Sequence, residues 1–285
     1  IAERLAARGF AVTLIDAAAG PASGASGNPV GIIRPLPSLD DNRLSRFLRA
    51  GYLHATRHLA ALAAEGLPLS WSRCGVLHLA RDAPHEATQR RAITEQAPPA
   101  EFARFVEREE ATRLAGWPVE AGGWWFPGGG WIAPPSLCAA NLARHADRIV
   151  SRFATTVASL ERHGDLWLLR AADGSVIAEA PQVVLAAGAQ VGRLVPERLL
   201  PVWPGRGTVS LLPAGDLPAL DTARECVVCR LGYVTPALDG IRCAGATMAR
   251  DFDPAPRIDD HIENLHRLDV ILPGYARTLD PAQLA

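Results

Sequence analysis

The sequence lacks the features of a membrane protein, of a secreted disulfide framework and of a metal centre. No apolar run approaches the roughly 20 residues that a membrane-spanning helix requires, and no basic segment followed by an apolar stretch indicates secretion. Five cysteines in 285 residues, an odd number, argue against a disulfide framework and favour a reducing cytoplasm. No Ser-His-Asp or metal-ligand constellation occurs, so we expect no metal site. A net charge of −1 excludes a globally basic, nucleic-acid-binding chain.

Two of the cysteines, Cys226 and Cys229, have the spacing of a redox or metal-binding pair. A redox pair belongs at the start of a helix, and a zinc site needs a second pair of ligands. Here the two cysteines lie in an apolar, β-branched run, where positions three apart point to opposite faces of a sheet. We therefore interpret both as buried structural cysteines.

The most informative segment that is present is the apolar run 11–16, which ends in Asp16. A strand that ends in a carboxylate, with a helical segment at 1–9 before it, is typical of a dinucleotide-binding unit. In such a unit the acid accepts hydrogen bonds from ribose hydroxyls. Small residues follow at 24–28, so the backbone there could approach a bulky cofactor closely. No strand with a glycine fingerprint precedes residue 1, and we expect the chain to begin inside its own first β-α-β unit.

The order of the remaining predicted elements indicates two layers that are interleaved along the chain. Helices are predicted at 86–96, 107–114, 136–146 and 258–271, and strands at 74–79, 148–153, 180–188, 208–212, 225–230, 232–236 and 241–246. Residues 155–161 and 165–171 alternate as a hairpin that turns at Gly164. The aromatic, glycine-rich segment 122–135 is expected to line a pocket or to form a tight hairpin, with Ser136 capping the helix after it.

A long amphipathic helix is predicted at 41–64, with Asp40 or Asp41 as its N-cap. Arg43, Arg46 and Arg57 lie on the face opposite the apolar one and form either a solvated surface or a phosphate-contacting patch. The predicted apolar face consists of Leu44, Phe47, Leu48, Tyr52, Ala55, Leu59 and Leu62.

The strand that ends in Asp16, the segment 24–28 and the later Val-Val-Leu-Ala-Ala-Gly run at 183–188 resemble FAD-dependent amine oxidoreductases of the D-amino-acid oxidase and glycine oxidase type. Further similar motifs occur at 74–77, 126–131, 134–135, 205–207, 209–210, 232–236 and 245–246. The resemblance extends from residue 1 to about residue 253. It is closest to the tRNA-modifying members of the family.

This resemblance implies an α/β fold, in which a Rossmann-type, D-amino-acid-oxidase-like FAD domain is interleaved with an antiparallel or mixed-sheet substrate domain. Residues 1–70 and 136–195 are assigned to the FAD-binding layer, and residues 71–135 and 196–285 to the substrate-side layer. Both layers are expected to be truncated, because the family's glycine fingerprint precedes this sequence. The family's final segment, which carries the arginine for the substrate carboxylate, would follow it.

The implied chemistry is oxidation of the carbon next to a secondary amine, giving an imine that water hydrolyses. In the tRNA-modifying relatives this converts the 5-carboxymethylaminomethyl group of a wobble (2-thio)uridine into a 5-aminomethyl group. A methyltransferase domain using S-adenosyl-L-methionine is expected in the full-length parent protein. The alternatives are a glycine, D-amino-acid or other small secondary-amine oxidase on the same fold, and an inactive fragment of such an enzyme. A tRNA partner needs a local basic surface, for which Arg90 and Arg91 could extend the helical arginines.

The resemblance also assigns site residues. Val157 would meet the adenine through its backbone, with core packing as the alternative, and Gly188 could instead permit close packing of a helix on a strand. Tyr233 and Met248 match residues on the substrate side, with a core aromatic and a core methionine as the alternatives. Arg206 and Arg230 are cations to which no carboxylate-binding role is assigned. The full set of expected cofactor-binding residues is Asp16, Gly24, Ala25, Ser26, Gly27, Asn28, Gly31, Val157, Ala187 and Gly188.

Overall fold

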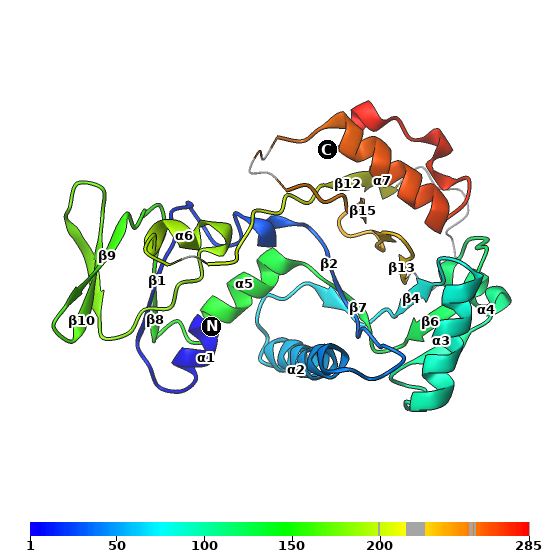
Figure 1. The fold of residues 1–285 in the computed structure, drawn as a ribbon, viewed down its shortest axis with the longest axis horizontal. Helices are drawn as coiled ribbons and strands as arrows, with labels where there is room; N and C mark the ends of the chain where they lie inside the picture. The colour runs from blue at the N-terminus through cyan, green and yellow to red at the C-terminus, as the bar shows by residue number, and fades with distance from the viewer. Residues whose placement is uncertain (199, 215–225, 251–252, 254, 285) are drawn as a thin grey trace. The chain divides into compact units, whose positions relative to one another are not determined.

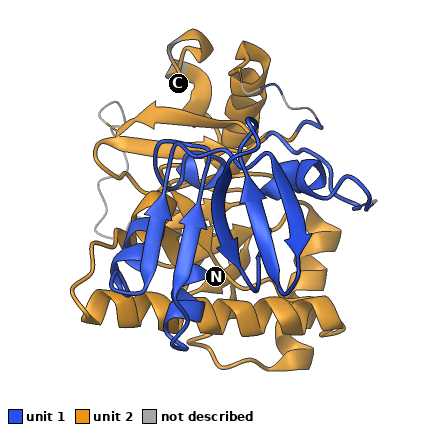
Figure 2. Ribbon diagram, turned by 90° about the vertical axis from the view of Figure 1, so that its left-hand side faces the viewer, with its two compact units in different colours: residues 1–27, 138–206, 249–253 blue, residues 28–137, 207–248, 254–285 orange. Residues whose placement is uncertain are grey.

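The computed structural model describes residues 1–198, 200–214, 226–250, 253 and 255–284 (Figure 1). The chain divides into two compact units, which are coloured separately in Figure 2. Unit 1 comprises Ile1–Gly27, Cys138–Arg206 and Ala249–Asp253, and unit 2 comprises Asn28–Leu137, Gly207–Met248 and Pro254–Ala285. By their contacts, residues 28–70 therefore belong to unit 2. The assignment of one layer to FAD and the other to the substrate stays a prediction.

Unit 1 contains a parallel strand pair and a small antiparallel sheet. Helix α1 (Ala2–Ala6) leads into β1 (Val12–Ile15), which pairs in parallel with β8 (Ile149–Arg152). Strands β9 (Ser159–His163), β10 (Leu166–Arg170) and β11 (Val176–Ala180) form the second sheet in the order β11-β10-β9. Gly164 joins β9 to β10 with a φ of +57°, a conformation that glycine adopts easily. The predicted helical start, the strand before Asp16 and the hairpin are confirmed.

The predicted buried strand at 180–188 is wrong. Strand β11 ends at Ala180, and residues 181–187 form no strand. Val184 in this run is exposed. An apolar run becomes a buried strand only where neighbouring strands supply hydrogen bonds and cover both faces. In the described part of unit 1, β1 pairs only with β8, and neither strand pairs with this run.

Unit 2 is built on a seven-stranded mixed sheet in the order β12-β15-β14-β13-β4-β6-β5. All neighbours are antiparallel except β13 and β4, which run parallel. The mixed sheet predicted for the substrate side is confirmed, although Glu225 of the predicted strand 225–230 lies outside the described residues. The strands are β4 (Val76–Leu79), β5 (Arg104–Val106), β6 (Gly123–Phe126), β12 (Val209–Pro213), β13 (Val227–Cys229), β14 (Tyr233–Val234) and β15 (Ile241–Gly245).

A second, antiparallel sheet of unit 2 has the order β2-β7-β3. Its strands are β2 (Gly31–Ile33), β3 (Trp71–Ser72) and β7 (Gly130–Ile132). Because β6 and β7 belong to different sheets, the segment 122–135 is not the tight hairpin that was one of its two predicted forms. Instead it connects the sheets, and the backbone comes very close at Gly130. A Cβ there would lie 1.8 Å from the carbonyl oxygen of Ser72, so only glycine fits.

Besides α1 and the four-residue α6 (Val191–Leu194), the described residues contain five longer helices, and the predicted positions of all five are confirmed within a few residues. In α5, however, Ser136 is not the N-cap. Its hydroxyl donates to the Ala133 carbonyl (2.7 Å) and accepts from the Ser70 N–H (3.0 Å), within the first turn of a helix that begins with proline. The helices are α2 (Arg43–Ala64), α3 (Ala83–Gln96), α4 (Arg108–Ala115), α5 (Pro134–Ala143) and α7 (Ile258–Ile271).

Helix α2 corrects two further predictions. Its N-cap is Asn42, whose side-chain oxygen accepts from the Ser45 N–H (3.0 Å), because Asp41 is instead paired with arginines. Leu44 and Phe47 are exposed, although they were placed on the buried face. At this end of the helix the buried side chain is Ser45, which donates to the Leu36 carbonyl. Farther along, the predicted face is buried at Tyr52, Leu59 and Leu62.

Helix α7 packs on the mixed sheet through both apolar and polar contacts. Leu265, Leu268 and Ile271 join one core cluster with strand residues of the sheet. His261 Nδ1 and the Ser210 hydroxyl are 2.8 Å apart in a buried hydrogen bond, and the Thr247 hydroxyl donates to Asp260 at 2.9 Å. Buried polar groups that are paired in this way fix the helix in one position on the sheet.

Cys226 and Cys229 are both free thiols. They are buried in separate core clusters, and their burial was predicted. Cys226 lies with Val228 in one cluster, and Cys229 lies with Val227 in the other. Burial raises the pKa of the Cys226 thiol to about 12 and that of the Cys229 thiol to about 11. Both are therefore neutral and unreactive at ordinary pH. No helix in the described ranges combines the length and apolar character needed to cross a membrane.

Truncation of the Leu268 side chain, which packs in the core under α7, should strongly destabilise the fold. Leu268 is fully buried, so we expect Leu268→Ala to lower the free energy of unfolding by about 2–5 kcal/mol through lost burial and a residual cavity. Val270→Ala on the partly exposed side of the same helix is the control and should cost less than half as much. Chemical denaturation measures both, and equal losses would contradict this packing.

His78 in β4 should make stability dependent on pH. Burial, with Arg34, His85 and Arg81 nearby, lowers the pKa of its imidazole to about 3. The unfolded chain protonates this residue below about pH 6.5, so the unfolded state binds more protons than the folded state between these values. Stability is therefore lost as pH falls through this window, by roughly 2 kcal/mol from about pH 7 to about pH 5. His78→Leu should lack this share of the pH dependence in denaturation curves; identical curves would contradict it.

Candidate functional site

Asp16 in unit 1 lies where strand β1 ends. Its backbone N–H donates to the backbone carbonyl of Arg152, at the end of the parallel strand β8 (3.0 Å). The carboxyl ends of β1 and β8 therefore lie at the same edge of the strand pair. The carboxylate is exposed, and its Oδ1 accepts from the Ala18 N–H at 2.9 Å. That contact fixes the direction of the side chain. The second oxygen, Oδ2, has no hydrogen-bond partner in the described residues and can accept from a ligand.

The small-residue segment after Asp16 folds as the short helix η1 (Ala25–Gly27). The Gly27 N–H donates to the Gly24 carbonyl at 2.8 Å. A Cβ on Gly27 would lie 2.8 Å from the carbonyl oxygen of Ala22, whereas open space surrounds Gly24. Ala25 and Ser26 are exposed. The segment therefore presents mostly backbone to its surroundings, which allows a large ligand to approach closely.

The structure brings Val157 to the same edge as Asp16. The Thr155 N–H donates to the Asp16 carbonyl (3.0 Å), and Val157 follows two residues later, half-buried before β9. Ala187 and Gly188 are exposed at the start of η2 (Gly188–Gln190), and Gly188 has a φ of +53°. Nothing lies within 4 Å of where a Gly188 Cβ would be, so the close helix packing considered for this glycine does not occur in the described structure.

The remaining predicted residues belong to unit 2. Asn28 is exposed, and Gly31 pairs with Ile132 across β2 and β7. Met248 is 83% exposed, so it is not a core methionine. Tyr233 is half-buried and lines a pocket, so it is not a fully enclosed core aromatic.

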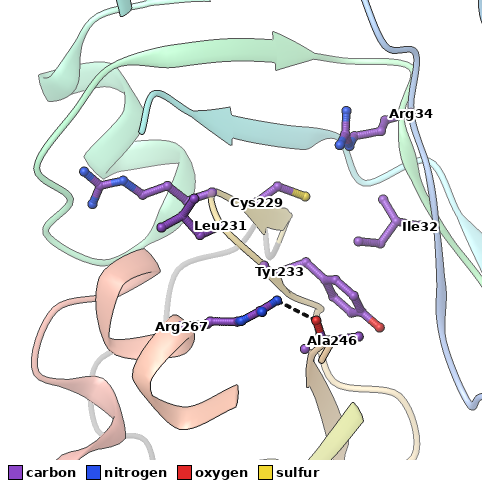
Figure 3. A pocket seen from close by; sticks show the side chains of 10 residues that line it. Ile32, Arg34, Cys229, Leu231, Tyr233, Ala246 and Arg267 are labelled. Carbon is purple, nitrogen blue, oxygen red and sulfur yellow. Dashed lines mark hydrogen bonds between the residues drawn. The ribbon is translucent and has the colours of Figure 1, made fainter. Parts of the chain in front are cut away.

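The pocket around Tyr233 has a volume of about 250 Å³ (Figure 3). It is bordered by β2, the β13–β14 turn, the end of β15 and α7. Burial raises the pKa of the Tyr233 phenol to about 12, so this hydroxyl stays protonated and can donate a hydrogen bond. The lining residues are Ile32, Arg34, Cys229, Arg230, Leu231, Gly232, Tyr233, Gly245, Ala246 and Arg267.

Three arginines line this pocket, and two of them have structural partners. Arg230 is 11% exposed and donates to the carbonyl oxygens of Ala80 (2.9 Å) and Val270 (2.8 Å), among others. Arg267 donates to the Ala246 carbonyl at 2.6 Å, drawn as a dashed line in Figure 3, and pairs with Glu263. Both guanidinium groups are therefore held by other groups of this chain, and no carboxylate-binding role was assigned to Arg230 from the sequence. The third, Arg34, was not singled out from the sequence.

The helical arginines proposed for tRNA are exposed on α2, but they differ in their partners. Arg46 pairs with Asp41 at 3.0 Å. Arg90 pairs with Glu86 and Glu107, and Arg91 pairs with Glu95 (3.0 Å), so the two proposed extensions are already neutralised. Arg43 and Arg57 remain exposed without a carboxylate partner in the described chain. No cluster of metal-ligating side chains was found within the described ranges.

Comparison with curated proteins gives relatives that match the whole chain. The tRNA 5-methylaminomethyl-2-thiouridine biosynthesis bifunctional protein MnmC of Aromatoleum aromaticum is 55% identical over 285 residues, covering 100% of this chain and 44% of that protein. The protein of the same name from Thiobacillus denitrificans is 44% identical over 280 residues, covering 96% of this chain and 44% of that protein. The chain thus spans less than half the length of these relatives.

Solved structures of amine oxidases have the same fold. Iminodiacetate oxidase from Chelativorans sp. BNC1 matches with a TM-score of 0.79 at 24% identity, covering 100% of this chain and 77% of that one. Glycine oxidase from Geobacillus kaustophilus matches with a TM-score of 0.76 at 22% identity, covering 100% and 76%. These matches confirm the predicted D-amino-acid-oxidase-like fold class. A family model described as "FAD dependent oxidoreductase" matches residues 1–283, and the chain belongs to this family.

Proposed function

We propose that this chain is the oxidase part of a tRNA-modifying protein. It would remove the carboxymethyl group from 5-carboxymethylaminomethyl-(2-thio)uridine at the wobble position of tRNA and leave 5-aminomethyl-(2-thio)uridine. The observation that carries this proposal is the 55% identity, over the whole chain, to a bifunctional protein named for 5-methylaminomethyl-2-thiouridine biosynthesis. The family match supports the class of reaction.

The residues of unit 1 fit a dinucleotide cofactor, for which we propose FAD. Asp16 offers a carboxylate oxygen, Oδ2, to a ribose hydroxyl at the end of a parallel strand. Gly24 and Gly188 leave open space where side chains would stand, so a cofactor could approach the backbone closely at both positions. Ala25, Ser26 and Gly27 would lie along the cofactor in the same way. FAD held by these residues would supply a two-electron acceptor for the carbon next to the amine.

The pocket of unit 2 would orient the amine substrate and would not react with it covalently. Ile32 and Leu231 provide apolar walls, and the Tyr233 hydroxyl can donate to an anionic group of the substrate. The Cys229 thiol has a pKa of about 11, so it is not a nucleophile at ordinary pH. The chemistry of this pocket is therefore positioning and hydrogen bonding.

Partners and location follow from the proposed reaction. Because the chain spans 44% of its relative, we propose that the parent protein also carries a methyltransferase domain, which would methylate the aminomethyl product. For tRNA contact we propose Arg43 and Arg57, which are exposed on one helix and can neutralise phosphates. The proposed location is the cytoplasm, and the five free cysteines are consistent with a reducing compartment.

Asp16→Ala should weaken FAD binding. It removes a charge-assisted hydrogen bond worth roughly 1.5–3 kcal/mol, so we expect the dissociation constant to rise on the order of 10- to 100-fold. Asp147→Ala is the matched control, because Asp147 is an exposed acid before the opposite end of β8. Titration of the flavin-free protein with FAD, followed by flavin fluorescence, measures both. Unchanged affinity in Asp16→Ala would remove this residue from the site.

Tyr233→Phe should lower turnover while flavin content stays intact. Loss of its hydrogen bond to the substrate predicts a decrease in kcat/KM on the order of 10-fold or more for a carboxymethylaminomethyl nucleoside. Tyr52→Phe is the control, because Tyr52 is a buried tyrosine of α2 that does not line this pocket. If steady-state kinetics show the same kcat/KM for wild type and Tyr233→Phe, the tyrosine does not contact the substrate.

A further inference from the structure

A second pocket of unit 2 lies beside helix α2 and has a volume of about 720 Å³. It is bordered by α2, by the end of α3 and by the segments 35–37 and 98–103. The side-chain amide of Gln96 at the end of α3 donates to the carbonyl groups of Ser38 and Leu39, which holds the loop before α2 against α3. Sites for small molecules have volumes of roughly 300–1,000 Å³, so this pocket can hold a ligand of nucleotide size.

Tyr52 and Arg73 place two hydrogen-bond donors in this pocket. Tyr52 is only 8% exposed, and burial raises the pKa of its phenol, so the hydroxyl stays protonated. A Cβ on Gly128 would lie 2.8 Å from the Tyr52 hydroxyl and 3.1 Å from Arg73 Nη2, so the two donors lie close together around this glycine. Neither donor has a hydrogen-bond partner among the described residues. A buried hydroxyl without a partner costs free energy, which a ligand with acceptor oxygens would recover.

The charges around this pocket favour an anionic ligand. Asp41 pairs with Arg49 (2.7 Å) and Arg46 (3.0 Å), which hold the pKa of its carboxyl below the ordinary value. Glu101 is exposed, so water and salt screen its charge. Arg73 is also exposed, and it has no carboxylate partner in the part of the chain that the structure describes. Its guanidinium is therefore available to the oxygens of a phosphate.

Much of the remaining wall of this pocket is apolar. Phe102 packs edge-on against Tyr52, with 5.9 Å between the ring centroids. Leu36 and Leu53 are partly exposed, and prolines at 98–99 also line the pocket. Nucleobases that leave their stack pack on aromatic and apolar side chains without strict sequence preference. A pair of phosphate donors beside an apolar wall therefore matches a nucleotide.

The two pockets of unit 2 border the same stretch of chain. Arg34, which follows β2, lines the pocket of Tyr233, and the next residue, Pro35, lines the pocket of Tyr52. Helix α2, which borders the second pocket, also carries the exposed Arg43 and Arg57. An RNA strand with one nucleotide at the first pocket could therefore place a neighbouring nucleotide in the second. This adjacency favours part of a strand over an unrelated small ligand.

We propose that the pocket beside Tyr52 and Arg73 binds a second nucleotide of the tRNA, next to the one whose side group is oxidised. Its phosphate accepts hydrogen bonds from Arg73 and from the Tyr52 hydroxyl, and its base packs on the apolar wall. This inference rests on the proposed oxidase function, and it adds a site that selects RNA over a small amine. A free nucleoside has no second nucleotide and leaves this pocket empty.

The test measures binding of an anticodon stem-loop RNA with an unmodified wobble uridine to the flavin-loaded protein that contains this chain. Fluorescence anisotropy gives the dissociation constant at several salt concentrations. We expect Arg73→Met to raise this constant on the order of 10-fold and to reduce the slope of log Kd against log salt by roughly 0.7–0.9, because one phosphate contact is lost. Arg73→Lys should recover part of the affinity, because it keeps the charge but not the planar donor geometry. Gly128→Ala should also weaken binding, because its methyl group would displace both donors.

Arg113→Met is the matched control, since it removes the same charge from an exposed arginine of α4 outside both pockets. It should leave the dissociation constant nearly unchanged. Equal losses for Arg73→Met and Arg113→Met would overturn the proposal, because the effect would then be one of general charge. Binding of uridine 5′-phosphate as tightly as the RNA would also overturn it, since the pocket would then serve a free nucleotide.

Failure of this inference and failure of the proposed function are distinguishable. If wild type does not oxidise a stem-loop that carries 5-carboxymethylaminomethyluridine, the proposed function fails. Binding of the unmodified stem-loop still decides whether Arg73 holds a nucleotide, because it needs no turnover. Flavin content and denaturation curves of each variant show whether it is folded.

Discussion

The pocket of unit 2 depends on a close backbone approach between strands β14 and β15. A Cβ on Gly232 would lie 2.6 Å from the carbonyl oxygen of Gly245, so any other residue would push the strands apart. In this register Tyr233 pairs with Gly245, and Arg267 of α7 donates to the carbonyl of the next residue, Ala246. This glycine contact lies directly beside the tyrosine and near the contact between α7 and the end of β15, so a side chain at position 232 would disturb both. The position of Tyr233 in the pocket depends on this geometry.

Charge distribution decides which of these side chains can act on a ligand. The carbonyl groups and carboxylates that hold Arg230 and Arg267 make them part of the framework. Within the described residues, Arg34 donates hydrogen bonds to a carbonyl and to a neutral thiol and has no carboxylate partner. In unit 1 the two oxygens of a single carboxylate differ in the same way. One oxygen of Asp16 is fixed by the Ala18 N–H, and the other is left for a hydrogen-bond donor.

Much of the fold could be predicted where local pattern and tertiary environment agree. The amphipathic spacing of 258–271 predicted α7 to the residue, and the alternation around Cys226 and Cys229 placed them in separate clusters. The strand at 180–188 could not be predicted correctly, because an apolar run does not reveal whether partner strands flank it. The burial predicted for Leu44 and Phe47 was wrong for a similar reason. Helical periodicity shows which face of a helix is apolar, but not how far along the helix other elements cover that face.

The candidate site was predictable in part. Asp16 and Tyr233 could be proposed as site residues because a strand-end acid and a family motif mark them in the sequence. Arg34 was missed, because the chain contains 29 basic residues and sequence alone does not show which of them has a carboxylate partner. Arg230 was noted instead, although its donors are directed to backbone carbonyls. Ion pairing depends on contacts between residues far apart in the chain, and only the structure supplies these.

Product analysis tests the central claim most directly. The flavin-loaded parent protein is incubated with tRNA that carries 5-carboxymethylaminomethyl-uridine at the wobble position, without S-adenosyl-L-methionine, and the nucleosides are separated by mass. The account predicts conversion to 5-aminomethyl-uridine, with one glyoxylate released for each nucleoside converted. A wobble nucleoside that is unchanged while glycine or another small amine is oxidised would contradict it.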